Sequence, residues 1–386
     1  MRHRPMRILA VSGTRADWGL LAPVLSMLRD DARFDLRLAV TGQHLMADSA
    51  SRAEVTAEGF AIDHEIDMEL GPDDSPPALA RASGLALAGT GAALDRDRPD
   101  LMLVLGDRYE ILCAVQAALL AGVPVAHLCG GDITEGAMDD AIRHAITKLS
   151  ALHFTSNAEA ARRVRQMGEA PARVFDVGSP GIDRIRSITP IPPEALLAEL
   201  GLAAPRGPVF VVTFHPETLS EAGAAQARAV LDALDAFHEA TLIMTGSNAD
   251  PGARAVDRMM TGYAAGRADA VHRASLGSRR YVSALAMADA VIGNSSSGLY
   301  EAPSFGIPTV NIGERQAGRL RGPSVIDCAP DRDGIVAAIR RALRTDCRSI
   351  TNPYGDGHSA ARIVAELARI DTPRSLLRKR FRDIPT

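Results

Sequence analysis

Residues that mark disulfide-rich, zinc-binding or nucleic-acid-binding proteins are scarce in this chain. Only four of its 386 residues are cysteines, and none lies in a Cys-x-x-Cys pair or at ligand spacing from a histidine. The sequence therefore disfavours a disulfide framework and a structural zinc site, and it fits a reducing cytoplasm. The net charge is −4 and no basic stripe interleaved with aromatic residues occurs, so we expect no nucleic-acid partner.

Long apolar runs are also missing. None approaches the length of a membrane span, and the apolar run 8–11 behind the basic N-terminus is too short for a signal peptide. We therefore expect a cytoplasmic protein with no membrane partner. The first predicted strand is not followed by Gly-x-Gly-x-x-Gly, which argues against a nicotinamide cofactor. The hydrophobic fraction of 46 % is that of a globular protein, and the length allows two cores of about 100–200 residues each.

Short apolar runs that end in turn residues recur along the chain. They predict strands at residues 7–12, 36–41, 101–105, 124–128, 152–155, 174–177, 209–214, 241–245, 290–292, 308–312 and 325–328. Between them lie segments with three-to-four-residue apolar periodicity, which predicts amphipathic helices, as at 20–28, 159–167 and 226–237. Continuous apolar strands that alternate with such helices predict an α/β fold whose parallel sheets are covered on both faces.

A proline-dense interruption divides the strands into two sets. Residues 187–193 and 204–208 contain the proline clusters typical of linkers. We therefore predict two similar α/β domains facing a central cleft, an N-terminal one at residues 1–185 and a C-terminal one at 186–370. The basic tail at 371–386 either crosses the cleft or forms a solvated end. Ligands of parallel sheets bind at the carboxyl ends of the strands, so polar motifs at those ends are the candidate functional residues.

The most informative motif is the Ser-rich turn, Gly-Asn-Ser-Ser-Ser-Gly-Leu-Tyr-Glu at 293–301, which separates a predicted strand from a predicted helix. The start of such a helix offers free backbone N–H groups and the positive end of its dipole, an arrangement that binds anions. Three serine hydroxyls add donors, and Glu301 could bind a ribose diol. The motif favours a phosphate-bearing nucleotide, and a purely structural Ser-rich helix cap is the alternative.

Two motifs follow strands of the first half. After the first strand a leading glycine permits close approach to phosphate, and Arg15 could bind two of its oxygens. The alternative is a plain turn in which Asp17 caps the helix and Trp18 packs. After the strand 101–105, Asp107 and Arg108 lie where a parallel sheet does its chemistry, and a surface ion pair is the alternative.

The densest polar stretch lies at 127–148 and continues from a loop into a helix. Asp140 and His144 are one helical turn apart, as are Asp139 and Arg143, which predicts two ion pairs. Metal binding by Asp139, Asp140 and His144 is conceivable. The ion pairs explain the same residues more simply, so we predict no metal site.

In the second half, His215 ends the first strand and could act as an acid or contact a diphosphate, with a structural histidine as the alternative. Residues 245–248 repeat this arrangement one strand later. Arg315 and Arg319 add positive charge near the Ser-rich turn.

Taken together, these motifs resemble the hydrolysing UDP-N-acetylglucosamine 2-epimerases, which open sialic acid synthesis. The resemblance runs in order over nearly the whole chain and is carried by residues 13–21, 106–110, 130–148, 294–315 and 352–357. It implies a glycosyltransferase-B architecture, in which two Rossmann-like domains hold the nucleotide sugar between them. It also implies that UDP-N-acetylglucosamine and water become N-acetylmannosamine and UDP without a cofactor.

The resemblance also implies roles for individual residues. It assigns UDP-sugar binding to Arg15, His44, Arg108, His215, Asn248, Ser296, Ser297, Glu301 and Arg315. It places Asp107 and Asp139 beside the sugar as catalytic acids, and His215 counts with them among the catalytic residues. Some relatives carry a further acid two residues after the histidine that matches His127, where this chain has Cys129. The loop here is one residue longer and contains Asp132 and Glu135, and we assign Glu135 as the replacement catalytic acid.

The chemistry suits these residue types. The C2 proton of the sugar has no adjacent carbonyl, so its loss becomes feasible only as UDP leaves the anomeric carbon. The leaving diphosphate then needs cationic and amide donors, and carboxylates must take the proton and deliver water. The closest alternative is the same reaction on UDP-2,4-diacetamido-2,4,6-trideoxyglucose, for legionaminic acid. A non-hydrolysing epimerase, a glycosyltransferase and a silent nucleotide-sugar sensor are further alternatives. We expect a homo-oligomer, a dimer or a tetramer.

Overall fold

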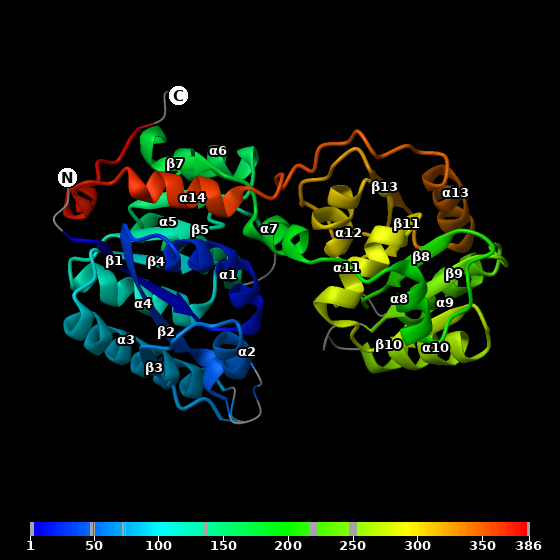
Figure 1. The fold of residues 1–386 in the computed structure, drawn as a ribbon, viewed down its shortest axis with the longest axis horizontal. Coiled ribbons are helices and arrows are strands. Elements are labelled where there is room, and N and C mark those ends of the chain that lie inside the picture. Colours follow the sequence, from blue (N-terminus) through cyan, green and yellow to red (C-terminus); the bar gives the residue numbers. More distant parts are fainter. Residues whose placement is uncertain are drawn as a thin grey trace. The chain divides into compact units, whose positions relative to one another are not determined.

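The computed structural model describes residues 4–383, except 47–48, 50, 72, 74, 135–137, 217–222 and 247–252. The chain forms two compact units. The first comprises Met1–Arg184 together with Tyr354–Thr386, and the second comprises Ile185–Pro353 (Figure 1). No helix among the described residues is long and apolar enough to cross a membrane.

The first unit contains a parallel sheet in the order β3-β2-β1-β4-β5-β6-β7. Its strands are β1 (Met6–Ser12), β2 (Phe34–Thr41), β3 (His64–Ile66), β4 (Leu101–Leu105), β5 (Val125–Leu128), β6 (Leu152–Thr155) and β7 (Val174–Asp176). Its helices are α1 (Arg15–Arg29), α2 (Ser51–Ala57), α3 (Pro76–Asp97), α4 (Tyr109–Leu120), α5 (Met138–Leu149), α6 (Ala158–Gln166) and α14 (Ser359–Ala368), with 3-10 turns η1 (Gly42–Leu45), η2 (Pro171–Arg173) and η4 (Pro373–Leu377). The first boundary between the units falls within α7 (Pro180–Ser187).

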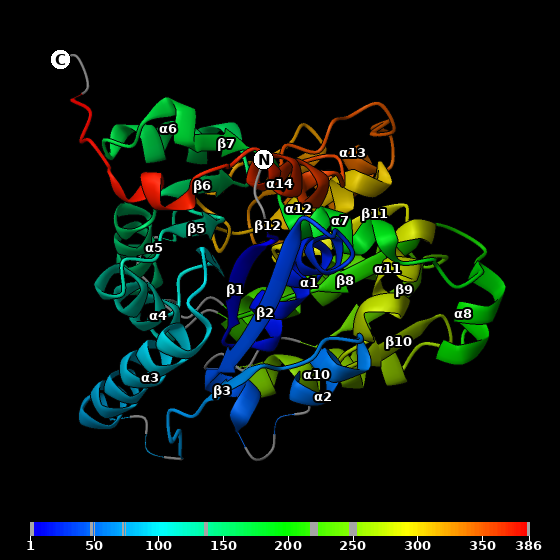
Figure 2. The same cartoon turned by 60° about the vertical axis from the view of Figure 1, so that its left-hand side comes forward.

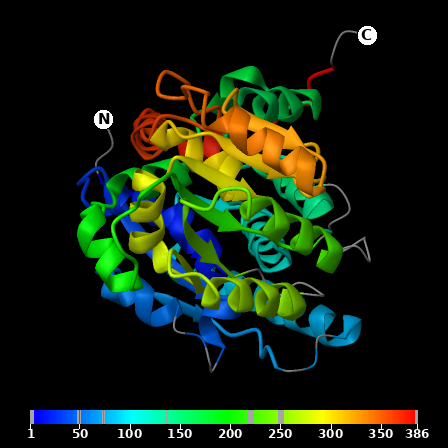
Figure 3. The same ribbon diagram turned by 90° about the vertical axis from the view of Figure 1, so that its right-hand side faces the viewer.

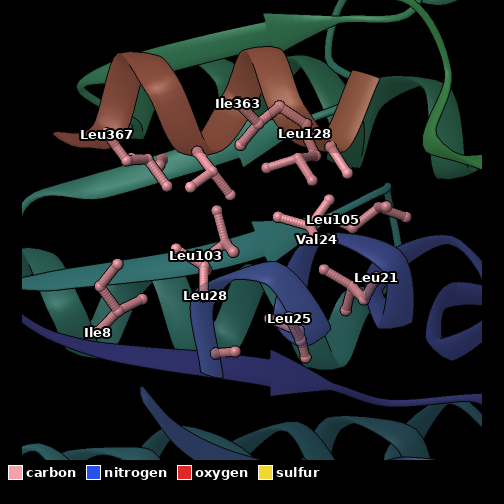
Figure 4. Packing of buried hydrophobic residues seen from close by; sticks show 14 of the residues in the cluster. Ile8, Leu21, Val24, Leu25, Leu28, Leu103, Leu105, Leu128, Ile363 and Leu367 are labelled. Atoms are coloured by element: carbon pink, nitrogen blue, oxygen red, sulfur yellow. The ribbon is translucent and has the colours of Figure 1, made fainter. Parts of the chain in front are cut away.

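Both faces of this sheet are buried, because successive strand residues point to opposite sides. Along β4, Leu101, Leu103 and Leu105 belong to a cluster with α1 and α14, whereas Met102 and Val104 belong to one with α4 and α5. Figure 4 shows the first of these clusters, in which side chains of α14 point toward those of the sheet. This continuous burial explains why the strands have apolar runs rather than alternating polar residues.

The second unit repeats the plan with a parallel sheet in the order β10-β9-β8-β11-β12-β13. Its strands are β8 (Val209–Thr213), β9 (Thr241–Thr245), β10 (Ala270–Arg273), β11 (Ala290–Gly293), β12 (Thr309–Ile312) and β13 (Val325–Cys328). Its helices are α8 (Pro193–Leu200), α9 (Gly223–Leu234), α10 (Ala253–Ala265), α11 (Gly277–Met287), α12 (Ser297–Tyr300), the 3-10 turn η3 (Ala302–Phe305) and α13 (Arg332–Ala342). Helices cover both faces of the sheet (Figure 3), α9, α10 and α13 on one and α8 and α11 on the other.

The end of the chain corrects the predicted domain boundary. We predicted that the second domain extends to residue 370, but the chain returns to the first unit at Tyr354. The reason is that α14 buries Ile363 and Leu367 completely against the sheet of the first unit. Asp183 fixes the start of this helix, because its carboxylate accepts hydrogen bonds from the backbone N–H groups of Ser359 (3.1 Å) and Ala360 (2.8 Å).

The predicted tail at 371–386 also belongs to the first unit. In Figures 1 and 2 its red trace passes the end of α6. The side chain of Arg173 donates to the carbonyl oxygens of Leu376 (2.7 Å) and Arg378 (3.1 Å), and the Arg382 N–H donates to the Gly168 carbonyl (3.1 Å). These contacts hold the tail along the first unit.

Candidate active site

The turn between β1 and α1 is held by a capping box. The Thr14 side chain accepts from the Asp17 N–H at 3.2 Å, and Asp17 accepts from the N–H groups of Thr14 (2.9 Å) and Gly13 (2.8 Å). Trp18 is 2 % exposed and meets Phe60 edge to face, with the ring centroids 5.0 Å apart. The structural roles that we considered for Asp17 and Trp18 are thus confirmed.

Arg15 and His44, both expected to bind the substrate, occupy different environments at this turn. The side chain of Arg15 is 70 % exposed, and its Nε lies 2.9 Å from Glu54 Oε2. His44 is buried, and its ring nitrogens lie 2.8 Å from Ser12 Oγ and 3.0 Å from Ser51 Oγ. Burial lowers the pKa of His44, so its neutral form is favoured. Arg15 can therefore reach a ligand from the surface, whereas His44 positions the turn.

Asp107 follows β4 and forms an ion pair with Arg143 of α5. Arg143 is 6 % exposed, and its other bonds run to the carbonyl oxygen of Asp132 (2.8 Å) and the hydroxyl of Thr134 (2.9 Å). The side chain of Asp107 is 26 % exposed. A buried guanidinium thus holds an accessible carboxylate in one orientation at the carboxyl end of the sheet.

One of the two predicted ion pairs on α5 is confirmed and the other is wrong. His144 Nε2 lies 3.5 Å from Asp140 Oδ2, as the one-turn spacing predicts. Arg143 pairs with Asp107 and Asp140 instead of Asp139. The reason is that Arg143 points from the helix into the sheet, where the end of β4 brings Asp107.

Asp139 acts on a different arginine. Burial lowers the pKa of Arg108, but the charges of Glu110 and Asp139 outweigh it and hold that pKa above its usual value. Arg108 Nε donates to Glu110 Oε1 at 2.6 Å, and Glu110 is 1 % exposed. Asp139 is therefore near enough to Arg108 for their charges to interact, and its side chain is partly exposed. Among the described residues, no group of three or more His, Cys, Asp or Glu side chains is arranged to hold a metal ion.

The loop after β5 carries the half-buried thiol of Cys129. Burial raises the pKa of the Cys129 thiol, and the nearby charges of Asp132 and Asp107 raise it further, so the thiol stays protonated. The Asp132 carboxylate accepts from Ser156 Oγ (2.8 Å) and Asn157 Nδ2 (3.1 Å), so it joins the loop to the start of α6. Our assigned replacement acid, Glu135, lies outside the described residues.

His127 supports this loop from inside the sheet. Its Nε2 lies 2.8 Å from the Gly106 carbonyl oxygen, and Thr147 Oγ lies 3.2 Å from its Nδ1. Complete burial lowers the pKa of His127 to about 3. A neutral imidazole thus links the residue before Asp107 to α5, which carries Asp139.

In the second unit, an asparagine joins two strand ends. Asn294, which follows β11, accepts from the His215 N–H (2.7 Å) and donates to the His215 carbonyl oxygen (2.8 Å). This reciprocal pair holds the backbone that follows β8 against the Ser-rich turn. Gly293 has φ +136°, and a Cβ there would lie 1.9 Å from the Thr213 carbonyl oxygen. Only glycine allows this close approach.

The Ser-rich turn offers two free backbone donors. The helix that we predicted after it is short, because α12 ends at Tyr300 and the 3-10 turn η3 follows. Within the described part of the chain, the N–H groups of Ser295 and Ser296 have no acceptor. Arg315 Nη1 lies 3.3 Å from the Asn294 carbonyl oxygen. A guanidinium and two free amides therefore gather at this turn, which is the chemistry of an anion site.

A half-buried acid, Glu301, ends the Ser-rich turn. Desolvation raises the pKa of Glu301 to about 7. The hydroxyl of Tyr281 hydrogen-bonds with Ser297 Oγ, and burial and the charge of Glu301 raise the Tyr281 pKa. Gln316 Nε2 donates to the Asn294 carbonyl oxygen at 2.8 Å, and Arg319 donates to Gln316. The last candidate residue, Asn248, lies outside the described residues.

Sequence reasoning missed four residues that support candidate residues of the two units, each unit taken by itself. Three of these pairs join residues at least 16 positions apart, whereas Arg108 and Glu110 lie within one motif. Asn294, Glu110 and Arg143 stand in motifs that we identified in the sequence, and Tyr281 does not. The four are Arg143 as the partner of Asp107, Glu110 as the partner of Arg108, Tyr281 as the partner of Ser297, and Asn294 as the partner of His215.

Residues 26–368 match the family model described as UDP-N-acetylglucosamine 2-epimerase. The chain belongs to this family. It is 36 % identical over 326 residues to the GDP/UDP-N,N'-diacetylbacillosamine 2-epimerase (hydrolyzing) of Campylobacter jejuni subsp. jejuni serotype O:2, which covers 83 % of this chain and 84 % of the relative. It is 34 % identical over 386 residues to polysialic acid biosynthesis protein P7 of Escherichia coli, which covers 98 % of each chain.

The crystal structure of UDP-GlcNAc 2-epimerase from Neisseria meningitidis, bound to UDP-GlcNAc, shares the fold. The TM-score is 0.75 at 19 % identity, and the match covers 95 % of this chain and 100 % of that chain. The predicted family and its α/β fold of two Rossmann-like units, as in glycosyltransferase-B enzymes, are thus confirmed. This membership also confirms that the chain belongs to a family of enzymes.

Proposed function

We propose that the enzyme is a hydrolysing 2-epimerase that converts UDP-N-acetylglucosamine and water to N-acetylmannosamine and UDP. The observation that carries this proposal is the accessible Asp107 carboxylate, which a buried arginine holds at the carboxyl end of β4. A carboxylate fixed in this way suits proton transfer at a sugar carbon. Family membership supports the choice of a UDP sugar as the substrate.

In the proposed reaction, the second unit binds the leaving group. The free N–H groups of Ser295 and Ser296 and the guanidinium of Arg315 donate to the diphosphate. Glu301 accepts from the ribose hydroxyls. These donors stabilise the charge that develops as the bond between C1 and the diphosphate oxygen breaks.

The first unit performs the proton transfers in this proposal. The bonding electrons leave with UDP, a carboxylate takes the C2 proton, and a glycal-like intermediate with a C1–C2 double bond remains. Hydration of that double bond then places hydroxyl at C1 and hydrogen at the opposite face of C2. Asp107 and Asp139 are the described acids for these steps, and Glu135 is the third acid that we assign. Arg15, Arg108, Asn248 and Ser297 complete the proposed substrate contacts, with His215 and His44 in support.

Proton NMR of the purified enzyme with UDP-N-acetylglucosamine in deuterated water tests this proposal. We expect free N-acetylmannosamine that carries deuterium at C2, released in equal amount with UDP. A product that keeps UDP would indicate a non-hydrolysing epimerase. Turnover that requires a sugar acceptor would indicate a glycosyltransferase, and UDP binding without any product over hours would indicate a sensor.

The second candidate is the same reaction on UDP-2,4-diacetamido-2,4,6-trideoxyglucose. It is favoured by the 36 % identity to the relative named as a diacetylbacillosamine epimerase. The comparison is a parallel measurement of kcat/KM for the two UDP sugars. A higher kcat/KM for the trideoxy sugar would replace the first proposal by the second without changing the roles of Asp107 and Arg315.

A further inference from the structure

A hollow of about 650 Å³ lies on the first unit between the turn after α6 and the C-terminal tail. Volumes of this order hold small-molecule ligands. We call it the tail hollow, and its charged lining consists of Arg173, Arg378, Lys379, Arg380 and Arg382 with the two acids Glu169 and Asp383. The lining is therefore basic, although the chain as a whole has a net charge of −4.

The tail hollow is remote from the candidate residues of the first unit. Glu169 lies in the connection from α6 to β7, which reaches the sheet at the edge where strands begin. Asp107 follows the end of β4, at the opposite edge of the same parallel sheet. The tail itself passes the end of α6 (Figure 2). The hollow thus has no part in the proposed substrate site.

The floor of the hollow is an ionic cluster that contains both lysines of the chain. Glu169 is 2 % exposed and lies 2.6 Å from Lys148 Nζ, 2.8 Å from Lys379 Nζ and 3.0 Å from His153 Nε2. The hydrogen bonds from these side chains outweigh burial and lower the pKa of Glu169 to about 2. Since two ammonium groups already neutralise this carboxylate, it does not cancel the charge of the arginines.

The tail contacts the first unit through two of its side chains, and its arginines line the hollow. Lys379 reaches Glu169, and Phe381 packs over Gly168 with Lys148 Nζ 5.0 Å from its ring centroid. Arg378, Arg380 and Arg382 are exposed and also line the tail hollow. Among the described residues, the guanidinium groups of these three arginines have no hydrogen-bond or ion-pair partner.

We propose that the tail hollow binds a small polyanion, a molecule with two or more phosphate or carboxylate groups. Three unpaired guanidinium groups offer planar forks that match such oxygens, and the volume admits a metabolite-sized ligand. Asp383, the other acid of the lining, leaves the excess positive. This proposal is independent of the proposed function.

A bound anion has a direct route to α5. Lys379 Nζ donates to the carbonyl oxygens of Lys148 (2.8 Å) and Ser150 (2.6 Å), at the end of the helix. The same helix begins with Asp139 and carries Arg143. An anion that binds the ammonium group of Lys379 therefore competes with the hydrogen bonds that this group donates at the C-terminal end of α5.

The scarcity of lysine makes the test specific. Labelling with 15N-lysine gives two backbone amide signals, one from α5 and one from the tail, and the Lys379→Arg variant assigns them. Inorganic pyrophosphate is titrated at constant ionic strength into the Arg315→Ala variant, which removes a competing cation of the Ser-rich turn. Citrate in a parallel titration distinguishes a carboxylate from a phosphate ligand. We expect a saturable shift of the Lys379 signal with a dissociation constant below about 1 mM.

Matched arginine variants decide the outcome. The double variant Arg380→Ser, Arg382→Ser should weaken pyrophosphate binding about tenfold or more, because each lost guanidinium removes charge-assisted hydrogen bonds. Arg374→Ser, an exposed arginine of the same tail outside the hollow, should leave binding unchanged. A linear shift without saturation, or equal binding by the double variant and the wild type, would overturn the proposal.

Discussion

At the scale of single residues, the candidate site depends on charges whose partners are buried. Arg143 has 6 % exposure, yet it bonds the carboxylate of Asp107, the carbonyl of Asp132 and the hydroxyl of Thr134. A guanidinium with this many acceptors cannot turn away without leaving buried groups unpaired. Asp107 is therefore held in place before any substrate arrives.

We expect Asp107→Asn to lower kcat at least about a hundredfold, because an amide cannot accept the C2 proton. UDP affinity should change little, since the proposed diphosphate donors lie in the second unit. The rate of UDP release from the sugar measures kcat, and calorimetric titration with UDP measures the affinity for UDP. Asp100→Asn, which affects a surface pair with Arg4, serves as the matched control and should retain full turnover. Full turnover by Asp107→Asn would exclude it as a catalytic acid.

Glu301 predicts a pH dependence of binding. Its pKa is raised to about 7 because desolvation disfavours the ionised form, so the carboxylate that accepts ribose hydroxyls forms only as the pH rises through 7. We expect the affinity of the inactive Asp107→Asn variant for UDP-N-acetylglucosamine to fall up to about tenfold from about pH 8 to pH 6.

The control for this dependence is Glu301→Gln in the same background. An amide does not titrate, so its affinity should be uniform over the range. A wild-type pH dependence in the glutamine variant would assign the effect to another group.

The sequence could predict contacts within one turn of a helix but not those between distant segments. The cap by Asp17 and the pair of Asp140 with His144 follow from local spacing. The pair of Arg143 with Asp107 spans 36 residues, and it forms only because parallel strands bring one end of β4 beside α5. Helical spacing alone favoured Asp139 instead.

At the scale of elements, strands with apolar runs were predictable, including the edge strands β7 and β13, but two other edge strands were not. The apolar runs at 101–105 and 241–245 coincide with β4 and β9. The structure also contains β3 and β10, which we did not predict. Each has one neighbouring strand and contains His with Glu or Arg, so neither has the continuous apolar run that burial on both faces produces.

At the turn after β11, we expect the single methyl group added by Gly293→Ala to lower the stability of the protein strongly. A Cβ at Gly293 would overlap the Thr213 carbonyl oxygen, and its φ of +136° is unfavourable for any other residue. We expect Gly293→Ala to destabilise the protein by at least about 3 kcal/mol, measured by urea unfolding.

Gly262→Ala is the matched control. Gly262 lies on the exposed face of α10, and a Cβ there meets no atom within 4 Å. Alanine is the better helix former, so this variant should be more stable by about 0.5–1 kcal/mol. Equal stability of the two variants would contradict the described turn.

At the scale of the whole molecule, two similar α/β units were predictable. That the chain returns to the first unit at Tyr354 was not. Residues 354–370 have the same amphipathic character as the helices of either unit. Their assignment to the first unit depends on the surface that α1 and the sheet leave for α14, and on Asp183 at its start. A sequence pattern shows that a helix has an apolar face, but not which sheet receives it.

The returning helix should contribute strongly to the stability of the first unit. We expect Leu367→Ala to cost about 2–5 kcal/mol, because this side chain is fully buried in the core (Figure 4). Leu377→Ala removes the same atoms from a side chain with 39 % exposure, and it should cost less than about 1 kcal/mol. Calorimetry measures both. A similar loss for the two variants would show that α14 is not part of this core.

The returning helix also has a consequence for biosynthesis. Ribosomes synthesise a chain from its N-terminus onward, and domains generally fold as they emerge from the ribosome. Ile363 and Leu367 are translated after Ile185–Pro353, yet they cover the sheet of the first unit, whose strands all precede residue 185. The nascent first unit must therefore wait, with this apolar surface open, until all of Ile185–Pro353 has been synthesised.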